Sequence, residues 1–90
     1  MAALAEETLA WRAIKPGHKV LDRDGNEVGT VSRVLADDGA DIFHGVAVHH
    51  GLPILGADHE IVAARIERIG EDSIHTNLAA SELEGLRAPR

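Results

Sequence analysis

Histidines are the side chains of this sequence with the clearest capacity for chemistry. There are six among 90 residues. Three of them, His49, His50 and His59, lie close together in the chain, with Asp58 and Glu60 on either side of His59. Imidazole and carboxylate groups are ligands that zinc, nickel and iron take from proteins. One interpretation is therefore a small metal-binding or ligand-binding protein built on these histidines.

The spacing of the histidines argues against a shared ion. His49 and His50 are consecutive, so in a strand their side chains point to opposite faces of the sheet. The stretch from His59 begins like the helix of a zinc protease, but Ala63 stands where the second histidine would be. We therefore expect no metal and no cofactor, and ordinary hydrogen bonds for these residues and for His44. A metal or ligand site that uses all four histidines stays open as the alternative.

Other patterns that carry catalysis are missing from the sequence. It has no cysteine, which excludes disulfides, thiolate metal sites and a cysteine nucleophile. It has no Gly-x-Ser-x-Gly elbow, no Walker loop and no Gly-x-Gly-x-x-Gly phosphate loop. The stretch from Asp22 starts like a calcium loop, but Gly25 takes the fourth position instead of the sixth, and Arg33 takes the twelfth, where glutamate is needed. We predict no catalytic residues and no enzymatic activity.

The elements that must position these side chains are strands. Residues 18–35 form two valine-bearing segments joined by Asp24-Gly25-Asn26, which is typical of a tight β-hairpin. A bulge near Gly29 would bring Val28 and Val31 to one face and bend the second strand. Similar short runs, separated by turn residues, follow at the spacing of a small all-β domain. The predicted strands cover residues 19–22, 27–35, 42–49, 59–63, 65–69 and 73–78.

The third predicted strand carries apolar side chains on both faces. Ile42, Val46 and Val48 share one face, while Phe43 and Ala47 share the other. Such a strand is either central to the fold or pressed against a second subunit. The loop that follows, residues 51–57, holds apolar side chains between glycines and a proline, and a dimer partner is one candidate to cover them. The predicted interface residues are Trp11, Phe43, Leu52, Ile54 and Leu55.

Composition limits the partners and the core. Hydrophobic residues make up 44% of the chain and aromatic residues only 2%, so the core must be built from Val, Ile, Leu and Ala. A net charge of −6 repels phosphate backbones, so we expect no direct contact with nucleic acid. The longest stretch without charged residues, 42–57, is too short and too interrupted to cross a membrane. The first residues do not resemble a signal peptide, and we expect a cytoplasmic protein.

The chain divides into one domain with short flanks. Residues 1–13 contain good helix formers and are predicted to form a helical arm that ends before Pro16-Gly17. Trp11 in this arm either plugs one end of the domain or anchors a partner. Ser81 and Glu84 have the spacing of a capping box, which predicts a short C-terminal helix. The domain is expected over residues 14–86, and residues 87–90 are expected to be a frayed tail.

The hairpin pattern and its continuation resemble a known family. The succession Gly17-x-x-Val20-x-Asp22-x-Asp24-Gly25-x-x-Val28-Gly29-x-Val31-x-x-Val34, followed by Ile61-Val62 and by Ile66-x-x-Ile69-x-x-Asp72-Ser73-Ile74, resembles the PRC-barrel domain. The resemblance covers about residues 14–86. It implies an all-β fold, a small and strongly bent β-barrel with short helical segments at both ends.

The resemblance also implies a function class. PRC-barrel domains occur in a photosynthetic reaction-centre subunit and in a ribosome maturation factor, where they bind other macromolecules through the barrel surface, and they are not known as enzymes. Many stand-alone members look like dimers. The leading expectation is therefore a non-enzymatic homodimer that acts as a protein-interaction module with an unknown partner. A ribosome or RNA-processing accessory that acts through a protein partner is a further alternative.

Overall fold

Six strands and three short 3-10 turns make up the part of the chain that the structure, a computed structural model, describes: residues 10–37, 39–51 and 56–89. The prediction of an all-β fold is confirmed. None of the helical turns in these three ranges is long or apolar enough to span a membrane. The elements are η2 (Trp11–Ala13), β1 (Lys19–Leu21), β2 (Glu27–Asp37), β3 (Ile42–His50), β4 (Ala57–Val62), η3 (Ala63–Arg65), β5 (Ile66–Ile69), β6 (Ser73–Thr76) and η4 (Ala80–Gly85).

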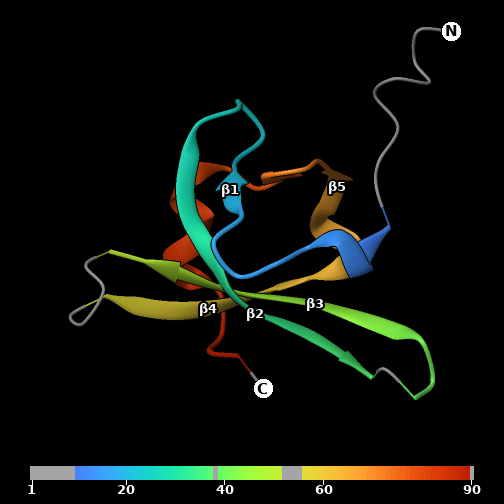
Figure 1. Ribbon diagram of the computed structural model, residues 1–90. Coiled ribbons are helices and arrows are strands. Elements are labelled where there is room, and N and C mark those ends of the chain that lie inside the picture. The colour runs from blue at the N-terminus through green and yellow to red at the C-terminus, as the bar shows by residue number, and fades with distance from the viewer. Residues whose placement is uncertain (1–9, 38, 52–55, 90) are drawn as a thin grey trace, which may run out of the picture.

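The six strands form one bent sheet in the order β4-β3-β2-β1-β6-β5. Neighbouring strands are antiparallel except β1 and β6, which pair in parallel. Figure 1 shows that the long strand β2 runs through both halves of the sheet and curves between them. The sheet curls in the manner of a barrel. It does not close, because its two edge strands, β4 and β5, are not hydrogen-bonded to each other.

Bulges in β2 produce the bend. β1 pairs Val20 with Gly29 and Leu21 with Glu27, so Val28 is the extra residue, and the predicted bulge near Gly29 is confirmed. Gly29 also lies so close to β3 that a Cβ atom there would stand 2.5 Å from the carbonyl oxygen of His49. Only glycine allows the two backbones to approach in this way.

The hairpin turn between β1 and β2 is held by a buried carboxylate. Asp22 is 2% exposed, and its Oδ1 accepts hydrogen bonds from the backbone N–H of Asp24 at 2.8 Å and of Asn26 at 2.9 Å. Gly25 takes the left-handed conformation at φ +87° that the turn needs. The calcium-like stretch of the sequence is thus a hairpin turn, with the first aspartate bonded to its own backbone.

The core is aliphatic, as the composition predicts. Val20, Val46, Val48 and Ile74 have no exposed surface, and they belong to one cluster with Val31, Ile61, Ile69, Leu78 and Leu83. Trp11 and Phe43 pack on this cluster while keeping part of their surface in solvent. β3 lies between β2 and β4 with residues 45–48 fully buried, so its two-sided apolar pattern is that of a central strand.

The chain ends differ in detail from the prediction. The arm is described from Ala10 onward, where Trp11–Ala13 form a single 3-10 turn; its first nine residues, like the interface candidates Leu52, Ile54 and Leu55, lie outside the described ranges. The predicted capping box of Ser81 and Glu84 is wrong. The N–H of Ala79 donates to Glu82 at 2.7 Å instead, because the turn begins at Ala80 and thereby buries Leu83.

The residues after η4 run along the edge strand β4. The carbonyl oxygen of Leu86 accepts a hydrogen bond from Nδ1 of His59 at 3.0 Å. The carbonyl oxygen of Arg87 accepts one from the backbone N–H of Glu60 at 2.9 Å. The tail that the sequence predicts to be frayed is therefore tied to the sheet at its first residue, since the edge of β4 offers it unpaired backbone groups.

Candidate interaction surface

The three histidines of the predicted metal cluster have separate partners. Nδ1 of His49 lies 2.7 Å from Oδ1 of Asp58, which is its cross-strand neighbour on β4. Nδ1 of His50 donates to the carbonyl oxygen of Val28 at 3.0 Å, and His59 donates to the C-terminal segment. Within the described ranges, no three His, Asp or Glu side chains are grouped so that they could hold a metal ion.

The strand register explains why these histidines do not converge. β3 and β4 pair Val48 with His59 and His49 with Asp58, so His59 shares the face of Val48 while His49 takes the opposite face. His50 falls on the face of His59, but both use Nδ1 to donate to backbone carbonyls. The fourth candidate, His44, is half-buried near the start of β3. The register therefore separates His49 from His50 and His59, and the part of the chain that the structure describes holds no group of three possible ligands.

A serine and a histidine meet at Asp58, in an order that does not favour nucleophilic catalysis. Oγ of Ser32 donates to Oδ2 of Asp58 at 3.0 Å, while His49 binds the other carboxylate oxygen. The hydrogen bond from His49 is the main reason that the pKa of Asp58 lies below its ordinary value. In a catalytic triad the histidine stands between serine and aspartate and takes the serine proton. Here the aspartate stands between them, so in this arrangement the serine hydroxyl donates to a carboxylate and His49 is not placed to take its proton.

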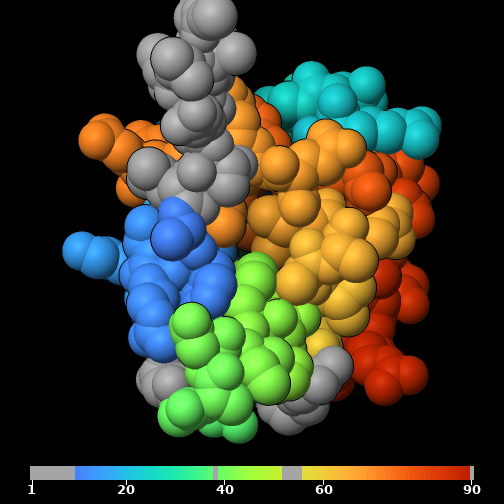
Figure 2. All heavy atoms as spheres, turned by 90° about the vertical axis from the view of Figure 1, so that its right-hand side faces the viewer, coloured from blue at the N-terminus to red at the C-terminus, as the bar shows by residue number. Residues whose placement is uncertain are grey.

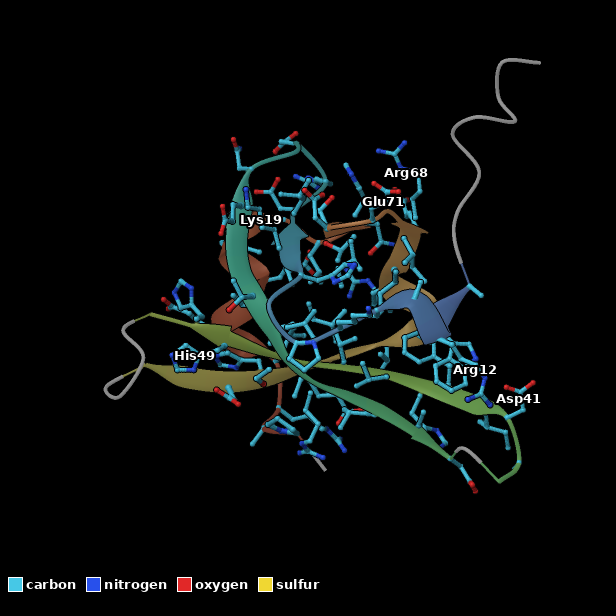
Figure 3. All side chains as sticks on the ribbon, viewed as in Figure 1. Arg12, Lys19, Asp41, His49, Arg68 and Glu71 are labelled. Atoms are coloured by element: carbon cyan, nitrogen blue, oxygen red, sulfur yellow. The ribbon has the colours of Figure 1, made fainter. Side chains whose placement is uncertain are left out.

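The predicted interface residues Trp11 and Phe43 come together in the structure. Their rings stack with centroids 5.6 Å apart and planes 5° apart. The guanidinium carbon of Arg12 lies 4.4 Å from the centroid of the Trp11 ring. Nη2 of Arg12 also pairs with Oδ1 of Asp41 at 2.9 Å. Both residues are labelled in Figure 3. These contacts fasten η2 to the tip of the β2–β3 hairpin.

Beside the stacked rings lies an apolar groove of about 310 Å³. We call it the aromatic groove, and its lining comes from η2, the start of β3, η3 and β5. Figure 2 shows the face on which these segments, drawn in blue, green and orange, meet. Its lining includes Trp11, Phe43, Ala63, Ile66, Ile69, Glu67 and Arg68.

Ile42 adds an exposed apolar side chain at the tip of the β2–β3 hairpin, on the face of β3 opposite to Phe43. It is 48% exposed at the start of β3, directly before Phe43. The other large hydrophobic residue with a comparable exposure in the described ranges is Val62, at 42% on β4. Our sequence analysis did not select Ile42 as an interface residue. Its position could have indicated this exposure, because Ile42 follows the turn that ends at Asp41, and the first residue of a strand beyond a turn is less covered than the centre of the strand.

A second and larger groove of about 540 Å³ lies between the start of β2 and η4. Its lining includes the acidic side chains of Glu27 and Glu84 together with His50. Nε2 of His50 and Oε2 of Glu84 are 3.8 Å apart there. The aromatic groove has one carboxylate in its lining, Glu67, beside Arg68, and it has two aromatic rings that the larger groove lacks. Because protein interfaces concentrate aromatic side chains, we take the smaller aromatic groove as the candidate interaction surface.

Comparison with known proteins agrees with this architecture. The family model of the PRC-barrel domain matches residues 17–83, from the turn before β1 through β6 to the buried Leu83. No curated protein matches the chain. The match covers every strand of the sheet and most of the chain, whereas Trp11 and Arg12 precede it. The chain therefore belongs to the PRC-barrel domain family.

Proposed function

We propose that this PRC-barrel protein is a non-enzymatic homodimer that acts as a protein-interaction module. The observation that carries the proposal is the stacked pair Trp11 and Phe43, which lines one side of an apolar groove. Aromatic side chains near the centre of an interface supply most of the binding free energy in many complexes. A surface with this composition is better suited to contact with protein than with water.

The energetics favour a contact at this place. Burial of apolar surface stabilises by about 25 cal/mol per Å², and Trp11 and Phe43 keep part of their surface in solvent. The stacked rings are already ordered by their contact with each other and with the core, so a partner need not immobilise them again. A preorganised aromatic wall therefore suits the centre of an interface.

The two alternatives from the sequence have less support. The metal-binding alternative lacks a set of ligands, since no three His, Asp or Glu side chains within residues 10–37, 39–51 and 56–89 are grouped so that they could hold an ion. A role as a ribosome or RNA-processing accessory would need a protein intermediary, since the net charge of −6 opposes direct contact with RNA. We propose that the protein acts in the cytoplasm, whose reducing conditions suit a chain without cysteine.

Light scattering over a range of protein concentrations tests the dimer. We expect a mass of twice the 9.6 kDa chain, falling toward the single-chain value on dilution. A mass of 9.6 kDa at all concentrations would remove the homodimer. The interaction function is tested separately by affinity capture from the native cell extract, in which wild type is compared with Phe43→Ala. Capture of one protein by wild type and not by the variant is expected, and capture that ignores the substitution contradicts the proposed surface.

A further inference from the structure

We propose that the edge of β4 is a second binding site, for an extended basic peptide of a partner protein, and that residues 86–89 of the chain occupy this site until the partner displaces them. We call these residues the tail strap. They follow the part of the chain that matches the family model, residues 17–83. The inference goes beyond the proposed function, because β4 and the groove-lining β5 are the two opposite edges of the sheet.

The backbone of β4 is directed toward an added strand. Glu60 pairs with Ala47 of β3, but its N–H points away from β3 and donates to the carbonyl oxygen of Arg87 at 2.9 Å. Because backbone groups alternate in direction along a strand, those of Asp58 and Val62 point outward as well. Within the described ranges, the strap forms a backbone hydrogen bond with Glu60 alone. Extended peptides bind exposed sheet edges through such backbone groups.

The strap itself indicates the chemistry of the occupant. Glu60 is only 3% exposed although it lies on an edge strand, and the strap passes directly beside it. The strap carries Arg87, and Arg90 follows it in the sequence. Figure 1 shows the end of the chain leaving β4 on the side away from β1 and β5. Since positive charge offsets the cost of burying a carboxylate, this edge suits a basic peptide.

A longer peptide has contacts to gain that the strap does not make. Asp58 and Val62 flank Glu60 on the same face of β4. Val62 is 42% exposed, and so is the side chain of Asp58. A partner segment that continues along the strand in both directions covers an aliphatic side chain and faces a further carboxylate. These contacts give the partner its advantage over the strap.

Few contacts hold the strap in place. Leu86 packs on the core cluster, and its carbonyl oxygen accepts a hydrogen bond from Nδ1 of His59 at 3.0 Å. The bond from Glu60 to Arg87 is the next contact, while the side chains of Arg87 and Ala88 are exposed. Segments that bury few apolar side chains open locally at a low cost in free energy. The strap therefore detaches while the sheet stays folded.

Hydrogen exchange of wild type tests this detachment. The N–H of Glu60 bonds to the strap, whereas that of Ile61, the next residue of the same strand, points to β3. After correction for intrinsic rates, we expect Glu60 to exchange at least about 100-fold faster than Ile61, because only the strap has to open. Equal rates would mean that strap and sheet open together, and the displaceable strap would be wrong.

A synthetic peptide with the sequence Gly-Leu-Arg-Ala-Pro-Arg, that of residues 85–90, tests the site itself. Its addition should shift the NMR amide signals of Asp58, Glu60 and Val62 and leave those of Trp11 and Phe43 in place. A control peptide with glutamate at both arginine positions should bind at least about tenfold more weakly. Equal binding of the two peptides contradicts the basic occupant, and shifts elsewhere on the protein contradict the site.

Release of the strap should strengthen binding of the basic peptide. Leu86→Asp removes the apolar anchor, and we expect the affinity to rise at least about fivefold because the competing segment of the same chain is weakened. Ser81→Asp is the matched control, since it adds the same charge at an exposed position of η4. Circular dichroism of both variants verifies the sheet. Equal affinities in the two variants would show that the strap does not compete.

A reversible disulfide provides the opposite test in one protein. The chain has no cysteine, so Glu60→Cys combined with Arg87→Cys creates a single pair at positions already joined by a backbone hydrogen bond. The oxidised form should bind the peptide at least about tenfold more weakly than the reduced form, because the strap is then locked on β4. The two forms have the same sequence, so loss of the Glu60 carboxylate affects both alike. Equal binding in both forms would place the peptide elsewhere.

Discussion

The indole ring of Trp11 stacks on the phenyl ring of Phe43 with their planes 5° apart, so the turn before the sheet is clamped to the tip of the β2–β3 hairpin. The two residues are far apart in the sequence and contribute the only tryptophan and the only phenylalanine of the chain. The contact lines one wall of the aromatic groove. It therefore links the order of the N-terminal turn to the shape of the proposed interface.

The stacking gives a direct optical prediction. Phe43→Ala should shift the emission of Trp11 to longer wavelength and lower the free energy of unfolding by about 1–3 kcal/mol, since a half-buried ring and its stacking are lost. Phe43→Leu is the control that keeps apolar bulk without the ring. Fluorescence and urea denaturation measure both effects. Unchanged emission in Phe43→Ala would show that the rings are not in contact.

Gly45 is expected to be irreplaceable. Its φ is +146°, and a Cβ atom there would overlap the carbonyl oxygen of Ile61 where β3 meets the end of β4. Gly45→Ala should cost about 3 kcal/mol or more. Gly39→Ala is the control, because the nearest atom to its Cβ is 3.6 Å away. Thermal unfolding compares the two variants; equal melting temperatures would contradict the close approach.

The buried carboxylate of Asp22 should stabilise the first hairpin. Asp22→Ala leaves the N–H groups of Asp24 and Asn26 without their acceptor, and we expect a loss of about 1–3 kcal/mol. Asp22→Asn retains a carbonyl oxygen at the same place and should cost less. Urea denaturation gives both values. Equal losses for Asn and Ala would mean that the negative charge, rather than the acceptor oxygen alone, holds the turn.

Stability should fall in mild acid because of His75. Burial, and then the charge of Arg68, lowers the pKa of His75 below its ordinary value of 6.5. The unfolded chain therefore binds this proton more readily, so the contribution of neutral His75 is complete above about pH 6.5 and decreases as the pH falls toward the lower folded-state pKa. His75→Gln keeps an acceptor for Arg68 and should make the free energy of unfolding less dependent on pH in this window. An identical slope in wild type and variant contradicts the assignment.

Divalent metals should leave the protein unchanged. The histidines of β3 and β4 are directed to Asp58, Val28 and Leu86, so zinc or nickel has no assembled set of ligands among them. We expect protein purified without an affinity tag to contain no stoichiometric metal, and its melting temperature to be unaffected by either ion. A stoichiometric metal content that is lost in His50→Ala would restore the metal-binding alternative.

The sequence predicts the local elements of this fold well. The strand predicted at 42–49 is observed as Ile42–His50, and the Asp-Gly hairpin and the bulge in β2 are where the pattern places them. β4 begins two residues earlier than predicted, at Ala57. Ala57 and Asp58 are poor strand formers on their own, but they pair with His50 and His49 of the neighbouring strand. Cross-strand pairing overrides local preference there.

The contacts between distant segments could not be predicted in the same way. Local periodicity does not indicate that Arg12 reaches Asp41, or that Ile66 and Ile69 of β5 join Phe43 in one groove. Those contacts depend on the curvature of β2 and on the pairing of β1 with β6. The sequence identified Trp11 and Phe43 by residue type alone, and it missed Ile42 because exposure at a hairpin tip depends on what else packs nearby.

The parallel pairing of β1 with β6 has a consequence for synthesis of the chain. Lys19 aligns with Ser73, and Oγ1 of Thr76 donates to the carbonyl oxygen of Leu21 at 2.9 Å, so the first strand is completed by the last. Joining segments this far apart carries a large loop-closure cost before any contact repays it. A nascent chain consequently leaves β1 without one neighbour until Thr76 has emerged from the ribosome, and the sheet is completed only then.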